Sequence, residues 1–187
     1  MLDLVFASSL SSAALTSGAA CPDDFVSAEY HLADVCSAWL KGAPAYSATF
    51  RASLNPRPAS HQVLIYRRDD TWFMRIAGYR RGLSGSEVVT RRNEVAVSDV
   101  DVEALASRVT KASLERLSAM PYYGSENMIC TDGADLQLAM SSTGKKYVAA
   151  QHSCAGKTEI NEIAATFRQL ALKYDPDFAG LLTGLQD

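Results

Sequence analysis

The 187 residues of this chain carry a formal net charge of −3, and 48% of them are hydrophobic. Both values are ordinary for a folded protein, and the length fits one domain. The small negative charge argues against a protein that binds nucleic acid through a bulk positive charge.

The first twenty residues have the composition of an export signal. Residues 4–20 carry no charge, and Gly18, Ala19 and Ala20 are the small residues that a signal peptidase reads. We therefore predict an export signal over 1–20 and a single domain over 21–187, located in the bacterial periplasm or secreted. The usual basic residues are missing and Asp3 has the opposite sign, so a cytosolic N-terminus is the alternative. No later stretch is long and apolar enough to predict a membrane span.

The chain has four cysteines, and an even number in an exported protein indicates two disulfides. We predict a local bond between Cys21 and Cys36 and a bond between Cys130 and Cys154 across a hairpin. In the alternative, Cys21 carries a lipid anchor, although Gly18 stands where such a signal prefers leucine. No cysteine or histidine spacing typical of a zinc site is present, so no metal is predicted.

Periodicity and turn residues predict the elements of the first half of the chain. Residues 46–54 alternate strictly between apolar and polar, which is typical of a strand with one buried face. The predicted elements are a helix over 25–41, a strand over 46–54, a hairpin of strands 61–68 and 71–80, and a strand over 87–98.

The hairpin has a predicted register because Asp69 and Asp70 make a two-residue turn. This turn places Tyr66 opposite Phe73 and Leu64 opposite Arg75. One face of the hairpin then reads as core: Val63, Ile65, Trp72, Met74 and Ile76. The other face is a mixed aromatic and arginine surface that also includes Leu64, and we predict its binding residues to be Tyr66, Arg68, Phe73, Arg75 and Tyr79.

The second half predicts a helix from Asp99 or Asp101 to Met120 and a last helix that begins after Thr158 and ends at Asp175. Between these helices lie three predicted strands, over 127–131, 136–140 and 146–152. The order predicts an α+β fold: an antiparallel sheet of about six strands packed with three helices.

No catalytic constellation can be assembled from the three histidines. Cys130 and His152 could form a nucleophile and base, but a disulfide to Cys154 explains the cysteine without further assumption. The segment 132–135 resembles part of a calcium loop and lacks its closing glutamate. We predict no enzyme, no catalytic residue and no cofactor.

The aromatic and arginine surface is the strongest functional signal in the sequence. Between Arg51 and Arg92 the chain has nine arginines and no lysine. Arginine and tyrosine are enriched where proteins bind each other, and guanidinium groups bind carboxylates with directional bonds. The alternative is a solvated sheet face whose charges protect an edge.

The stretch Ile129-Cys130-Thr131-Asp132-Gly133, followed by a hairpin, Cys154 and an amphipathic helix, resembles a pattern in small uncharacterised exported proteins of proteobacteria. Some exported proteins of this style are immunity proteins or inhibitors. The resemblance implies an exported binding protein whose partner is a toxin or a cell-wall hydrolase. The small negative net charge predicts that it binds no nucleic acid. The alternative is a periplasmic protein that binds a small molecule or an envelope component.

Overall fold

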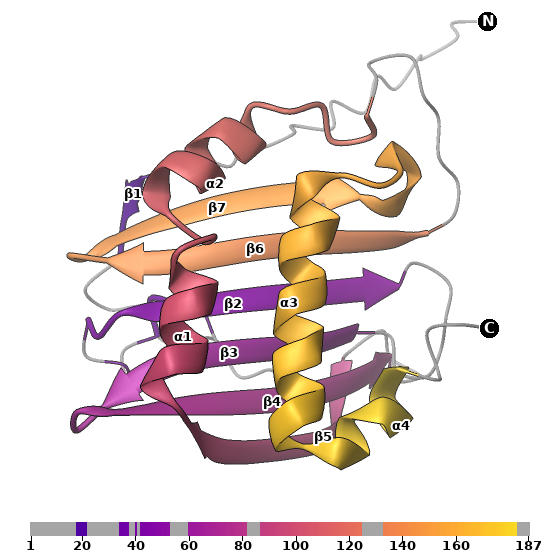
Figure 1. Cartoon of the computed structure of the whole chain (residues 1–187). Coiled ribbons are helices and arrows are strands. Elements are labelled where there is room, and N and C mark those ends of the chain that lie inside the picture. Colours follow the sequence, from indigo (N-terminus) through magenta and orange to yellow (C-terminus); the bar gives the residue numbers. More distant parts are fainter. Residues whose placement is uncertain are drawn as a thin grey trace, which may run out of the picture.

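Seven antiparallel strands form one sheet in the computed structural model, which describes residues 18–21, 34–37, 40, 42–52, 60–81, 87–124 and 133–182 (Figure 1). The spatial order is β1-β7-β6-β2-β3-β4-β5. The strands are β1 (Ala19–Ala20), β2 (Ala45–Ala52), β3 (Ser60–Arg68), β4 (Thr71–Arg81), β5 (Glu87–Val97), β6 (Ala134–Ser142) and β7 (Lys145–His152). The predicted α+β class with an antiparallel sheet is confirmed.

The helices α1, α2 and α3 lie on one face of this sheet (Figure 1). The helical elements are α1 (Asp99–Ala106), α2 (Lys111–Ser118), α3 (Glu159–Tyr174) and α4 (Ala179–Leu182), with short 3₁₀ turns at η2 (Ser153–Ala155) and η3 (Pro176–Phe178). The single helix expected over 99–120 is wrong, because two helices occupy this range. Thr110 starts α2 with a reciprocal capping box to Ser113, and this local bonding competes with helix continuation.

Two described hairpin turns pass through residues with positive φ. Asp69 and Asp70, between β3 and β4, have φ of 46° and 61°, and Thr143 and Gly144, between β6 and β7, have φ of 49° and 71°. Two such residues in succession give a turn whose twist matches that of the strands. The predicted pairing of β3 with β4 is confirmed residue by residue.

The edge strand β1 consists of the last two residues of the segment expected to be an export signal. Ala19 pairs with Lys146 and Ala20 with Lys145 on β7. The predicted strand over 127–131 lies outside the described residues.

The helix expected over 25–41 is wrong where the structure describes it. Asp34–Ser37 forms a turn in which the Ser37 N–H donates to the Asp34 carbonyl at 2.9 Å. The Asp34 carboxylate also accepts the N–H of Cys36 at 2.8 Å, so a side chain takes the place of helical bonding. The part of this predicted helix over 25–33 lies outside the described residues.

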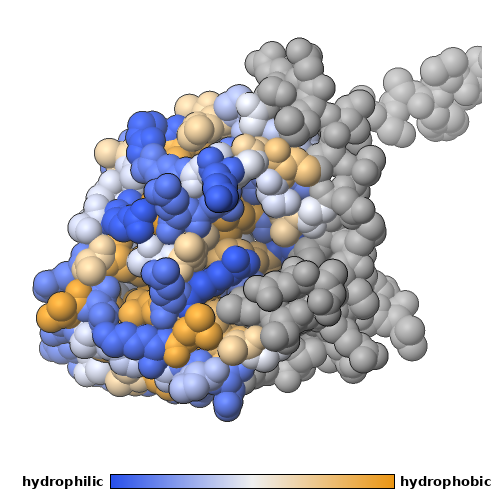
Figure 2. Space-filling model, turned by 45° about the vertical axis from the view of Figure 1, so that its right-hand side comes forward, coloured by the Kyte–Doolittle hydropathy of each residue, from blue (hydrophilic) through white to orange (hydrophobic). Residues whose placement is uncertain are grey.

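The sheet buries side chains on both faces. The larger core lies under the helices and includes Ile65, Met74 and Phe167. A smaller cluster lies on the opposite face, where Val35 and Leu40 cover apolar residues of the sheet. None of the described helices α1, α2 and α3 lies on this face, which is here called the helix-free face (Figure 1). On the side shown in Figure 2, hydrophilic and hydrophobic residues are interspersed.

The start of α1 is tied to the end of α3 through Asp101. Its carboxylate accepts hydrogen bonds from Lys173 at 2.7 Å, from Tyr174 at 2.5 Å and from Ser98 at 2.8 Å. These donors stabilise the ionised carboxylate and lower the pKa of Asp101 to about 2.

We expect Asp101→Asn to lower the free energy of unfolding near neutral pH by roughly 1 kcal/mol or more, since charged hydrogen bonds are lost. A carboxyl with a depressed pKa stabilises the fold above its unfolded value and loses that effect as the pH falls. The difference between variant and wild type should therefore shrink between about pH 4 and pH 2 in urea unfolding. Asp99→Asn, in the same helical turn, is the control, and a difference that persists at the acid end would contradict the assignment.

His61 is a second titratable group whose surroundings differ from water. It is completely buried, stacks on Phe50 with ring centroids 4.3 Å apart and meets the edge of Phe178 at 5.6 Å. Its Nε2 accepts a hydrogen bond from Arg168 at 3.4 Å. Burial and the positive charge of Arg168 together lower the pKa of His61 to about 3.

Because the unfolded chain protonates this histidine near pH 6.5 and the folded chain only near pH 3, stability should fall as the pH decreases through that window. The slope is at most about 1.4 kcal/mol per pH unit. His61→Phe keeps an aromatic ring on Phe50 and removes the titration, so its unfolding free energy should fall less steeply between about pH 6.5 and pH 4.5. Parallel slopes for the two proteins in urea unfolding would show that His61 does not titrate in this way.

Candidate functional site

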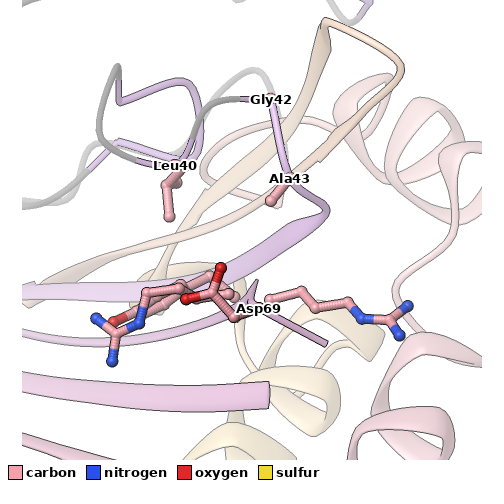
Figure 3. A pocket seen from close by; sticks show the side chains of 7 residues that line it. Leu40, Gly42, Ala43 and Asp69 are labelled. Carbon is pink, nitrogen blue, oxygen red and sulfur yellow. The ribbon is translucent and has the colours of Figure 1, made fainter. Parts of the chain in front are cut away.

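A pocket of about 430 Å³ opens beside the β3–β4 turn on the helix-free face. In Figure 3, Leu40, Gly42 and Ala43 lie on one side of it and Asp69 on the other. The residues that line it, here called the hairpin pocket, are Leu40, Gly42, Ala43, Tyr66, Arg67, Arg68 and Asp69. Two regions distant in the sequence therefore form this pocket.

Leu40, Gly42 and Ala43 form one wall of the pocket. A disulfide and an ion pair, here together called the clasp, hold this wall to the sheet. Cys36 forms a disulfide with Cys21, as predicted, and the N–H of Cys21 donates to the Gly144 carbonyl at 2.8 Å. The carboxylate of Asp34 forms an ion pair with Lys146 on β7.

Two further bonds fix the end of the wall. The Ser141 hydroxyl donates to the Ala43 carbonyl at 3.2 Å, and the Arg67 N–H donates to the Pro44 carbonyl at 3.3 Å. This segment is consequently attached to β7, β6 and β3.

Three of the predicted binding residues, Tyr66, Arg68 and Phe73, contact one another, and the first two line the pocket. The Arg68 guanidinium lies 4.1 Å from the centre of the Phe73 ring and donates to Glu94 at 3.2 Å. The Tyr66 hydroxyl donates to the other oxygen of Glu94 at 2.5 Å. Burial, followed by the bond to Glu94, raises the pKa of the Tyr66 hydroxyl. Tyr66 thus positions Glu94, and Glu94 with Phe73 positions Arg68.

The expectation of an aromatic and arginine surface is wrong at Tyr66 and Leu64. Tyr66 is 1% exposed and Leu64 is completely buried, because Val35 and Leu40 cover them, which local periodicity does not reveal. Arg75 is half-buried opposite Leu64, and its charge acts on Tyr66. Tyr79 pairs through its backbone with Ser60, while its side chain lies outside the described part of the chain.

The sequence alone did not identify Glu94, Arg67 or the wall of Leu40, Gly42 and Ala43 as parts of the site. It did predict the strand over 87–98 that carries Glu94. The register of that strand, which the structure shows, places Glu94 directly opposite Arg75. Arg67 projects to the other face of the sheet, 6.0 Å from the Trp72 ring, and forms an ion pair with Asp70 at 3.2 Å.

Arg68 gives the pocket its charged group, and its side chain is 49% exposed. A guanidinium has five N–H donors, so the ion pair with Glu94 leaves donors for a carboxylate or a backbone carbonyl of a bound molecule. Leu40 adds an apolar contact at the same opening.

The described residues contain no group of three or more histidine, cysteine, aspartate or glutamate side chains that could hold a metal ion. Within the same residues, no helix is long and apolar enough to cross a membrane. Cys154 is disulfide-bonded and lies in η2, beyond the end of β7, while its predicted partner Cys130 lies outside the described residues.

Comparison of this chain with protein families, with curated proteins and with solved structures finds no match.

Replacing both Cys21 and Cys36 by serine tests the clasp. The bond joins residues 15 apart, and opening such a loop should cost about 3 kcal/mol in the free energy of unfolding. The cover over Tyr66 should also loosen, so the alkaline titration of its hydroxyl, followed by ultraviolet absorbance, should move toward the ordinary range of tyrosine. Unchanged unfolding and an unchanged tyrosine titration would show that the disulfide does not hold the wall.

Proposed function

We propose that this protein is an exported binding protein of the immunity or inhibitor type, which holds a partner protein through the hairpin pocket. The proposed partner is a toxin or a cell-wall hydrolase in the periplasm. The observation that carries the proposal is the half-exposed Arg68, fixed on Phe73 and Glu94 at the mouth of the pocket.

A pre-positioned arginine favours binding because less side-chain freedom is lost when a partner arrives. Stacking on Phe73 and the bond to Glu94 restrict Arg68 before binding. Arginine in such a setting is a frequent hot-spot residue, and a carboxylate of the partner is the group it would bind best.

The charges around the pocket cancel. The three positive charges of Arg67, Arg68 and Arg75 balance the three negative charges of Asp69, Asp70 and Glu94, so the net charge is zero. Long-range attraction is therefore weak, and binding would rest on short, directional contacts at the pocket. The affinity should accordingly depend only slightly on salt.

Export is supported by the disulfide between Cys21 and Cys36, since such bonds persist in oxidising compartments. Cleavage after Ala20 would remove β1 and keep Cys21, so the clasp would survive in the mature chain.

A second candidate function is the binding of a small molecule or an envelope component in the same pocket. Its volume of about 430 Å³ lies within the usual size of ligand sites. For this second function, Arg68 would bind an acidic small molecule in place of a carboxylate of a partner protein. The mass of the bound molecule therefore distinguishes the two candidate functions.

Arg68→Ala should weaken binding by roughly 1–2 kcal/mol, as for a typical hot-spot residue, and leave the melting temperature within a few degrees of wild type. Wild type, Arg68→Ala and the control Arg92→Ala, an exposed arginine of β5, are used as baits on periplasmic extract. Native mass spectrometry then identifies a protein or a small molecule in the complex.

The proposal expects a protein that wild type and Arg92→Ala retain and Arg68→Ala loses, with its hydrolytic or toxic activity reduced in the complex. A retained small molecule in its place would support the second candidate. Equal retention by all three baits would contradict both.

A further inference from the structure

A second pocket, of about 260 Å³, lies at the opposite end of the helix-free face. Its floor consists of residues that alternate onto this face, with Thr49 beside Gln137 and Arg51 beside Asp135 in the β2–β6 register. The residues that line it, here called the tyrosine pocket, are Thr49, Arg51, Tyr122, Asp135, Leu136, Gln137 and Ala150. It shares no lining residue with the hairpin pocket.

One wall of the tyrosine pocket is a fixed aromatic ring. Tyr122 follows α2, and its carbonyl accepts the N–H of His152 at 2.8 Å, which attaches the turn to the edge of β7. Its hydroxyl donates to Asp135. Tyr123 packs against it with ring centroids 4.8 Å apart and nearly perpendicular planes. The two tyrosines remain 36% and 37% exposed, although they are large and partly apolar.

The floor offers polar groups that the rest of the described protein does not use. Among the described residues, neither the Arg51 guanidinium nor the Gln137 amide makes a hydrogen bond or ion pair. The Thr49 hydroxyl accepts from Gln62 at 3.1 Å and can still donate. Asp135 has acceptor sites beyond the one that Tyr122 occupies. Donors and acceptors therefore alternate beside an exposed ring.

This combination selects for a neutral ligand. An aromatic ring with a carboxylate would suit an organic cation, but Arg51 repels cations at the same opening. Arginine with an amide would suit an anion, but Asp135 repels anions there. A molecule with many hydroxyl groups and one apolar face satisfies the arginine, the carboxylate and the amide together, and places that face on the ring of Tyr122.

We propose that the tyrosine pocket binds one hexopyranose ring of a neutral saccharide, which stacks on Tyr122 and hydrogen-bonds to Arg51, Asp135 and Gln137. The volume lies just below the usual range for drug-sized ligands, so it suits a single ring, with the rest of a glycan outside. This site is independent of the proposed partner binding at the hairpin pocket, and either proposal can fail alone.

Saturation-transfer-difference NMR of the full chain with three neutral sugars, cellotriose, maltotriose and triacetylchitotriose, tests the site, with choline and inorganic sulfate as charged competitors. We expect transfer to the ring protons of at least one sugar and no competition by either ion. Gln137→Ala should weaken that binding at least about tenfold, because it removes a half-buried amide that binds no described residue. Gln169→Ala, an exposed glutamine on α3, is the matched control and should bind as wild type.

A pair of variants separates the aromatic ring from its hydroxyl. Tyr122→Phe should keep binding within about threefold, whereas Tyr122→Ala should abolish it, since stacking needs the ring. If Tyr122→Ala does not fold, the loss of sugar binding by Gln137→Ala is the test of the proposed site. Absence of transfer from all three sugars, displacement by choline or sulfate, or equal binding by Gln137→Ala and Gln169→Ala would each overturn the proposal.

Discussion

The disulfide between Cys21 and Cys36 attaches the cover of the helix-free face to the rest of the protein. A sheet with apolar residues on both faces has to be covered on each of them, and among the described residues Val35 and Leu40 cover the second face. Ordering the segments that carry these two side chains costs conformational entropy, which is a deficit in the free energy of folding. Covalent attachment to the β7 side, helped by the Asp34–Lys146 ion pair, offsets that deficit.

The clasp also decides which side chains of the hairpin are available for binding. With the cover in place, Tyr66 is removed from water and satisfies its hydroxyl on Glu94, which in turn fixes Arg68. A buried hydroxyl without a partner would be costly, so this chain of bonds is part of the packing as well as of the site. The exposed charged side chains of this hairpin then lie at the edge of the hairpin pocket, which Arg67 and Arg68 line.

The helix-free face thus has two different ends. Near the β3–β4 turn it is apolar and clasped, with arginines at the opening. Toward the start of β6 it becomes polar, and Thr49, Gln137 and Asp135 face an exposed tyrosine. The same strands supply both regions, since side chains along one face of a strand recur every second residue. One sheet can therefore present two pockets of unlike chemistry without additional elements.

Local sequence determined the parts of this protein that depend on neighbours along the chain. These are the antiparallel α+β class, the strands β2 to β7, and the β3–β4 register that follows from the Asp69–Asp70 turn. It also indicated the Cys21–Cys36 bond, because the two residues are close in sequence. Only the tertiary structure decided that Tyr66 is buried and that Glu94 holds Arg68. Both results come from contacts between segments distant in the chain, and periodicity reports which face a side chain occupies but not what covers that face.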